Sequence, residues 1–159
     1  MNTKLIQCLG ILFGFCLLAG CASQDATKKE SAVAVPNAVR EAFNGRFSNI
    51  KRVEWKLKAD RNYEAEFIFQ DTEIAAKFDA SGKWLETESS ILLSKVPQAV
   101  RDTVARTFKD YRIVETQIVE RCNELNPIYE LHLDNQKEIV KAQFSAGGQI
   151  LNQSQKPKP

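Results

Sequence analysis

The side chains most able to do chemistry stand at alternate positions of one segment. Glu130, His132 and Asp134 follow this spacing, and His132 is the only histidine of the chain. Imidazole and carboxylate groups can hold a metal ion or exchange protons. In an extended strand, however, alternate side chains stand roughly 6.6–7 Å apart, too far for three of them to hold one ion easily. No cysteine or second histidine completes a zinc set, so we predict a solvated charged face and no metal site.

Glu64 and Glu66 form a similar pair in an earlier segment. Paired carboxylates act as acid and base only where a pocket drives their pKa values apart, and an open sheet face has no such pocket. Nearby lysines on the same predicted surface offset the negative charge. The predicted binding face consists of Lys56, Glu64, Glu66, Lys77, Glu130, His132 and Lys141.

Recognisable catalytic motifs are absent from the sequence. It contains no glycine-rich phosphate loop, nucleophile elbow or serine–lysine motif. We therefore predict no catalytic residue and no cofactor. The alternative, an enzyme, would require a deep pocket lined by groups with perturbed pKa values.

The N-terminal residues have the pattern of a bacterial export signal. Lys4 precedes an apolar run over residues 5–18, which is shorter than the roughly 20 residues that a membrane-spanning helix needs. The run ends in a sequence that resembles the bacterial lipobox, whose cysteine sulfur receives diacylglycerol before cleavage. This lipobox comprises Leu18, Ala19, Gly20 and Cys21. We expect a cleaved signal peptide over residues 1–20 and lipid attachment at Cys21.

The expected anchor also indicates where the protein is located and which cysteine remains as a free thiol. By resemblance to Gram-negative lipoproteins, Ala22 in place of an aspartate favours the outer membrane, with the protein facing the periplasm. Cys8 and Cys16 leave with the signal, so Cys122 has no intrachain partner. We interpret Cys122 as a small, semi-buried residue; a nucleophile and an intermolecular cross-link are the alternatives.

Charge and composition limit the partners and the ordered region. The chain has 22 Lys and Arg against 20 Asp and Glu, interspersed and without a basic block, which argues against a nucleic-acid partner. Small polar residues predict a flexible tether over residues 21–34. The polar tail, residues 153–159, is expected to be disordered.

Two segments of the chain resemble each other. Residues 35–41 align with residues 96–102 at an offset of about 61, and Tyr63-Glu64 aligns with Tyr129-Glu130 at about 66. Each copy begins with a Val-Pro pair and an apolar stripe typical of a helix. The period then changes to two, and turns at Gly82 and Gly148 follow, as in antiparallel strands.

The pattern predicts an α+β fold of two tandem helix-plus-antiparallel-meander repeats (α-β-β-β-β). The repeats comprise residues 35–90 and 91–152, share one sheet and have their helices on its apolar face.

The lipobox, the two Val-Pro-x-Ala-Val helices, the Tyr-Glu strands and the glycine hairpins together resemble the PepSY-like, β-lactamase-inhibitor-like periplasmic proteins of Bacteroidota-type bacteria. The resemblance covers about residues 35–152. It implies tandem helix-plus-sheet repeats and suggests protein binding or inhibition. We expect a non-catalytic envelope lipoprotein whose outer sheet face binds an envelope protein or peptide. The alternative is a structural or stress-related envelope component with no discrete ligand.

Overall fold

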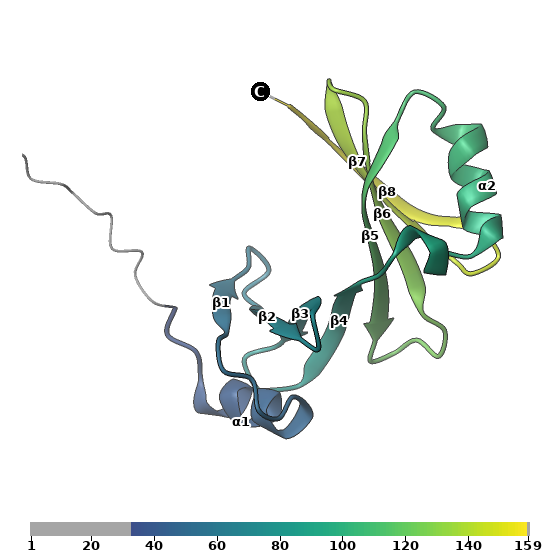
Figure 1. Ribbon diagram of the computed structural model, residues 1–159. Helices are drawn as coiled ribbons and strands as arrows, with labels where there is room; N and C mark the ends of the chain where they lie inside the picture. The colour runs from purple at the N-terminus through teal and green to yellow at the C-terminus, as the bar shows by residue number, and fades with distance from the viewer. Residues whose placement is uncertain (1–32, 159) are drawn as a thin grey trace, which may run out of the picture. The chain divides into compact units, whose positions relative to one another are not determined.

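The computed structural model describes residues 33–158, in which a helix and four strands are followed by a 3-10 turn, a second helix and four more strands (Figure 1). The signal peptide, the lipobox with Cys21 and the tether up to residue 32 lie outside the described residues. The elements are α1 (Asn37–Arg46), β1 (Glu54–Leu57), β2 (Tyr63–Phe69), β3 (Thr72–Phe78), β4 (Trp84–Ser90), η1 (Leu93–Lys95), α2 (Gln98–Thr107), β5 (Arg112–Arg121), β6 (Ile128–Asp134), β7 (Glu138–Phe144) and β8 (Ile150–Pro157). No helix within residues 33–158 is long and apolar enough to cross a bilayer.

All eight strands of the described region form one antiparallel sheet in the order of the sequence, from β1 to β8. The predicted α+β class with an antiparallel meander is thereby confirmed. The middle of the sheet is the β4–β5 pair, whose register runs from Glu86 opposite Arg121 to Ser90 opposite Gln117. Backbone hydrogen bonds therefore continue without interruption from the first four strands to the last four.

Each helix begins directly after a proline. Pro36 and Pro97 precede α1 and α2, and their carbonyl groups accept hydrogen bonds from the N–H groups of Val39 and Val100 at 3.1 Å. The missing proline N–H costs nothing there, because the first N–H groups of a helix have no intrahelical acceptor.

Each helix packs against its own strands, and the buried apolar side chains form two clusters. The first contains Val35, Val39, Phe43, Ala65, Phe67, Ala76 and Phe78. The second contains Val96, Val100, Val104, Phe108, Leu131, Leu133, Val140, Ala142 and Phe144. Because alternate strand residues point to opposite faces, the polar residues between these positions lie on the other side of the sheet.

The turns after β3 and β7 press against the helices. Gly82 and Gly148 have positive φ angles of 89° and 83°. A Cβ atom at Gly82 would lie 2.5 Å from the Ala38 carbonyl oxygen, and one at Gly148 would lie 2.4 Å from the Ala99 carbonyl oxygen. Both positions therefore require glycine for conformation and for space.

The C-terminal segment is ordered, so the prediction of a disordered tail over residues 153–159 is wrong for its described part. Strand β8 pairs with β7 as far as Pro157, opposite Glu138. The Lys158 ammonium group lies 2.8 Å from both carboxylate oxygens of Asp134. Polar side chains do not prevent backbone pairing, and the free edge of β7 supplies the hydrogen-bond partners.

Two residues differ from what their place in the sequence predicts. Val114 stands two residues before buried Thr116, an alternation that predicts an inward-facing side chain, but it is 50% exposed because the β5–β6 register shifts between Ile113 and Glu115. Such a bulge breaks the period of two. Cys122 is exposed and not semi-buried, because it follows the last residue of β5 in a turn.

Candidate functional site

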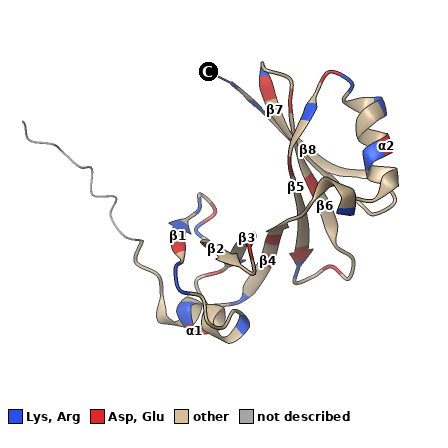
Figure 2. Ribbon diagram, viewed as in Figure 1, with Lys and Arg blue, Asp and Glu red and all other residues tan. Residues whose placement is uncertain are grey.

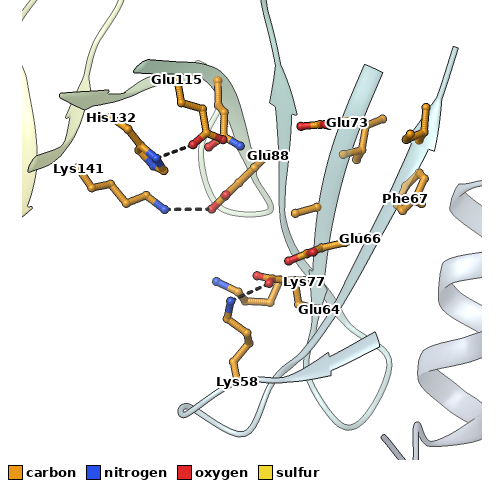
Figure 3. Close-up of a pocket in the computed structure, with 14 residues that line it drawn as sticks. Lys58, Glu64, Glu66, Phe67, Glu73, Lys77, Glu88, Glu115, His132 and Lys141 are labelled. Carbon is orange, nitrogen blue, oxygen red and sulfur yellow. Dashed lines mark hydrogen bonds and ion pairs between the residues drawn. The ribbon is translucent and has the colours of Figure 1, made fainter. Parts of the chain in front are cut away.

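The polar side chains of both halves of the sheet meet at a cavity of about 650 Å³, the polar hollow (Figure 3). Acidic and basic residues occur on strands of both halves (Figure 2). The lining residues are Lys58, Glu64, Glu66, Phe67, Ile68, Glu73, Ile74, Ala75, Lys77, Glu88, Glu115, Gln117, His132 and Lys141. They come from the segment after β1 and from strands β2 to β7, so the site draws on both halves of the sheet.

Strand register explains why the hollow has room. Ala75 of β3 lies opposite Glu66 of β2 on one side and opposite Glu88 of β4 on the other. Residues opposite one another in antiparallel strands have neighbouring side chains on the same face. The methyl group of Ala75 fills little of the space between these two longer side chains.

At the first half of the hollow, lysines pair with the carboxylates of β2. The Lys58 ammonium group lies 2.7 Å from Glu64, and that of Lys56 lies 2.6 Å from Glu66. Both lysine side chains are about 40% exposed, whereas the side chain of Glu64 is only 8% exposed. These pairs hold the carboxylates in place while the lysines remain in contact with water.

A second set of charges crosses the middle of the sheet. Glu86 of β4 accepts hydrogen bonds from Lys77 of β3 and from Arg121 of β5, the latter at 3.0 Å. Burial works against the charge of Glu86, but the hydrogen bonds from the two cations keep its pKa below the usual value. For Lys77, burial again opposes the charge, and the hydrogen bond to Glu86 raises its pKa. These charges therefore fix the β3–β4–β5 junction.

The second half contains a fully buried carboxylate. Glu130 of β6 has no exposed surface, and it lies 2.6 Å from the Lys141 ammonium group. The Gln143 amide donates a hydrogen bond to it at 2.7 Å, and His132 Nε2 lies 3.4 Å away. Burial disfavours the charged form of Glu130, yet its contacts with His132 and Lys141 and the hydrogen bond from Gln143 lower its pKa to about 2.

His132 links this buried carboxylate to the wall of the hollow. Its Nδ1 atom lies 2.6 Å from Glu115, and its Nε2 atom faces Glu130. The contact with Glu130 raises the pKa of His132, burial opposes this, and the charge of Glu115 adds to the increase. The imidazole therefore tends to carry a proton between two carboxylates.

Two carboxylates of the hollow are weakly paired or unpaired among residues 33–158. Glu88 has Lys141 at 3.8 Å, but that lysine is closer to Glu130. Burial raises the pKa of Glu88, and the charges of Glu130 and Glu86 add to the increase despite Lys141. Glu73 makes no ion pair within residues 33–158 and is exposed. The hollow therefore has an excess of negative charge on this side.

The predicted face residues are divided between the hollow and its surroundings. Glu64, Glu66, Lys77, His132 and Lys141 line the hollow. The other two members of the predicted face do not line it, because Lys56 contacts it only through Glu66 and Glu130 lies beneath Lys141. Sequence reasoning missed Glu73, Glu86, Glu88, Glu115 and Gln117. The alternation of Glu86 and Glu88 around buried Thr87 is the signal that could have identified this part of the site.

The expectation of an open, solvated face is wrong. Glu64 is 6% exposed and Glu130 is 0% exposed. Long side chains on adjacent strands lie over the carboxylates and exclude water, an effect that the period of one strand does not reveal. A pocket therefore exists where the sequence predicted none.

The chemistry available in the hollow is that of charge and hydrogen bonding. Its lining residues include carboxylates, ammonium groups, an imidazole and an amide, but no Ser, Thr or Cys. Within residues 33–158 no three His, Cys, Asp or Glu side chains are arranged to hold a metal ion. Asp134, the third residue of the alternating trio, is bonded to Lys158 and Arg112. Such a site is suited to holding a polar or charged group of a ligand.

Comparison with known proteins gives a family match and similar folds. The family described as "Putative beta-lactamase-inhibitor-like, PepSY-like" matches residues 61–152. A "putative periplasmic" protein of Bacteroides eggerthii is 20% identical, with 77% of this chain and 90% of that chain covered and a TM-score of 0.69. A BLIP-like protein of Bacteroides fragilis is 22% identical, with 81% and 92% covered and a TM-score of 0.65. At such identities these structures show a shared fold. A search of curated proteins found no match.

Proposed function

This chain belongs to the beta-lactamase-inhibitor-like, PepSY-like family, and from that premise we propose that it is a non-catalytic binding module that holds a protein or peptide partner in the polar hollow. The hollow is the observation that carries the proposal. Its charged groups are fixed by neighbouring side chains before any partner arrives, as in the Lys58–Glu64 and His132–Glu115 pairs. Prior fixation lowers the entropy that binding would otherwise cost.

The proposed setting is the bacterial cell envelope. The lipobox sequence ending at Cys21 supports a lipid anchor, and residues 21–34 could extend at most about 50 Å from it. The B. eggerthii protein of the same fold is called periplasmic, which supports the same compartment. Ala22 after the anchor favours the outer membrane. Replacing Cys21 by Ala should release the protein from the membrane fraction, and unchanged fractionation would refute the anchor.

We also propose that the two halves are tandem repeats. The same order of one helix and four strands occurs in both, and Pro36 and Gly82 have counterparts in Pro97 and Gly148. In each half, the glycine of the hairpin turn contacts a carbonyl group near the start of the helix. The two repeats would then jointly supply the hollow that neither half contains alone.

Site-specific photo-cross-linking in intact cells tests the binding proposal. A photoreactive residue in place of Glu73, which is exposed and lines the hollow, lies at the edge of the site, whereas one in place of Glu41 lies on the exposed surface of α1. A binding module should give one dominant adduct from position 73 and none of that mass from position 41. Reversing charge at Lys56, Glu64, Glu66 and Lys77 should remove the adduct, whereas reversing it at exposed Arg106 should not.

The competing hypothesis is a structural or stress-related envelope component without a discrete ligand. It predicts no dominant adduct from either position. An adduct that persists after the charges of the hollow are reversed would show that the partner binds elsewhere on the molecule.

A further inference from the structure

The cations of the hollow are already occupied. Each of its three lysines contacts a carboxylate: Lys58 contacts Glu64 at 2.7 Å, Lys141 contacts Glu130 at 2.6 Å, and Lys77 contacts Glu86. An anionic ligand would have to break one of these pairs and would leave a carboxylate without its partner. Breaking a partly buried pair is unfavourable, so the hollow is poorly suited to an anion.

The acceptors of the hollow are not all occupied. Glu88 is only 18% exposed, and its ion-pair partner among the described residues, Lys141, stands 3.8 Å away. The Oε1 atom of Gln117 is buried and has no hydrogen-bond partner within residues 33–158. Glu88 faces Val119 across the β4–β5 pair, and Gln117 is two residues further along the same strand on the same face. A donor placed between them would satisfy both groups, since a buried polar atom without a partner is costly.

Two apolar side chains also line the hollow within reach of a long ligand side chain. Ala75 lies opposite Glu88 and leaves space above it. Ile68 lines the same hollow, is 67% exposed, and stands opposite Glu73 in the β2–β3 pair. An aliphatic chain could rest on Ile68 and Ala75 while its charged end is directed toward carboxylates. Lysine and arginine combine such a stem and head in one side chain.

We propose that the polar hollow receives a lysine or arginine side chain of the partner, with the cationic head at Glu88 and Gln117 and the stem against Ile68 and Ala75. This inference rests on the proposed binding function and names the chemistry of its partner. Glu73 and Glu115 add negative charge beside the entering group. Charge-assisted hydrogen bonds to the head would then determine which peptides are accepted.

Titration of the isotope-labelled, full-length mature protein with capped peptides tests the inference. The peptide Gly-Leu-Arg-Leu-Gly is compared with the same peptide carrying citrulline, glutamate or lysine in place of arginine. Citrulline has nearly the shape of arginine but no charge. Backbone NMR shifts at Ala75 and Gln117 report the location and the Kd. The arginine and lysine peptides should bind about tenfold or more tightly than the citrulline peptide.

The matched variants are Glu88→Gln and Glu120→Gln. Glu120 is exposed on β5 and does not line the hollow. Glu88→Gln should weaken binding of the arginine peptide about tenfold, whereas Glu120→Gln should leave it unchanged. Because burial disfavours the charge of Glu88, Glu88→Gln should not lower the midpoint of urea unfolding. A lower midpoint would give Glu88 a structural role and would contradict the inference.

The remaining outcomes separate this inference from the proposed function. If the glutamate or citrulline peptide binds in the hollow as tightly as the arginine peptide, the hollow does not select a basic side chain and the inference is wrong. The proposed function as a peptide-binding module is then still supported. If agmatine, a free guanidinium compound, binds as tightly as the arginine peptide, the occupant is a small cation and the inference is wrong. Shifts confined to residues outside the hollow would overturn both proposals.

Discussion

Equivalent strand pairs in the two halves hold different side chains on the polar face. In the β2–β3 pair, Glu64 lies opposite Lys77 and Glu66 lies opposite Ala75. In the β6–β7 pair, Glu130 lies opposite Gln143 and His132 lies opposite Lys141. The apolar faces are alike, with a tyrosine opposite a phenylalanine in each pair. The two halves thus share a core pattern and differ in what covers the other face.

One position accounts for most of this difference. Lys141 of β7 lies over Glu130 and closes the second half, whereas Ala75 occupies the corresponding place in β3 and leaves the first half open. The carboxylate of the closed half, Glu130, has no exposed surface, whereas in the open half the side chain of Glu66 is 38% exposed. A lysine at this position stabilises the sheet, and an alanine there leaves room for a ligand.

Removing the buried carboxylate should have the largest effect on stability. Glu130→Ala removes a fully buried side chain and leaves the Gln143 amide without its acceptor, and we expect a loss of about 3 kcal/mol in the free energy of unfolding. Glu64→Ala should cost about 1 kcal/mol or less, because Lys58 can return to water. Urea unfolding of the two variants gives the comparison. Equal losses would contradict the difference between the halves.

The pH dependence of stability should follow from the same carboxylate. The folded-state pKa of Glu130 is about 2, below its ordinary value of 4.5. Its contribution, about 3 kcal/mol, is therefore complete above pH 4.5 and is lost as the pH falls toward 2. Urea unfolding between pH 2 and pH 7 should show this slope for the native chain and a much smaller one for Glu130→Gln.

His132 should give a pH dependence of stability with the opposite sign. Its folded-state pKa is raised above 6.5, so its contribution is complete below pH 6.5 and is lost as the pH rises through the folded value. Replacement by Gln should abolish the fall in stability on the alkaline side. A fall that persists in His132→Gln would assign it to another group.

Replacing the glycine of either hairpin turn by alanine should lower the stability of the protein to a similar extent. Gly82→Ala and Gly148→Ala each place a Cβ atom within 2.5 Å of a helix carbonyl oxygen at a positive φ angle. We expect each substitution to cost about 2 kcal/mol. Gly45→Ala is a suitable control, because a Cβ atom there meets no atom within 4 Å. Thermal unfolding would reveal any difference between the two turns, and a large one would show that the helices are held differently.

Filling the open position should change stability least and binding most. Ala75→Lys places an ammonium group beside Glu88 and Glu66, as Lys141 lies beside Glu130. We expect stability to change by about 1 kcal/mol or less and binding of the arginine peptide to be lost. Retained binding in this variant would show that the ligand does not use the space above Ala75.

The sequence predicted what depends on one strand or one helix at a time. The Val-Pro pairs at Pro36 and Pro97 marked the helix starts, and the period of two predicted strands with one apolar face, on which buried Phe67 and Leu131 lie. It could not predict the burial of Glu130, because that depends on Lys141 and Gln143 from the neighbouring strand. The bulge that exposes Val114 and the pairing of β8 likewise depend on adjacent strands.

The meander order has a consequence for how the chain reaches its fold. Each strand after β1 pairs with the strand that precedes it in the sequence. Strand pairing therefore does not depend on a segment far away along the chain. Topologies dominated by such short separations close their loops early and fold quickly. The leading half can therefore assemble on α1 before the trailing half has paired, and the growing sheet offers its last edge as the template for the next strand.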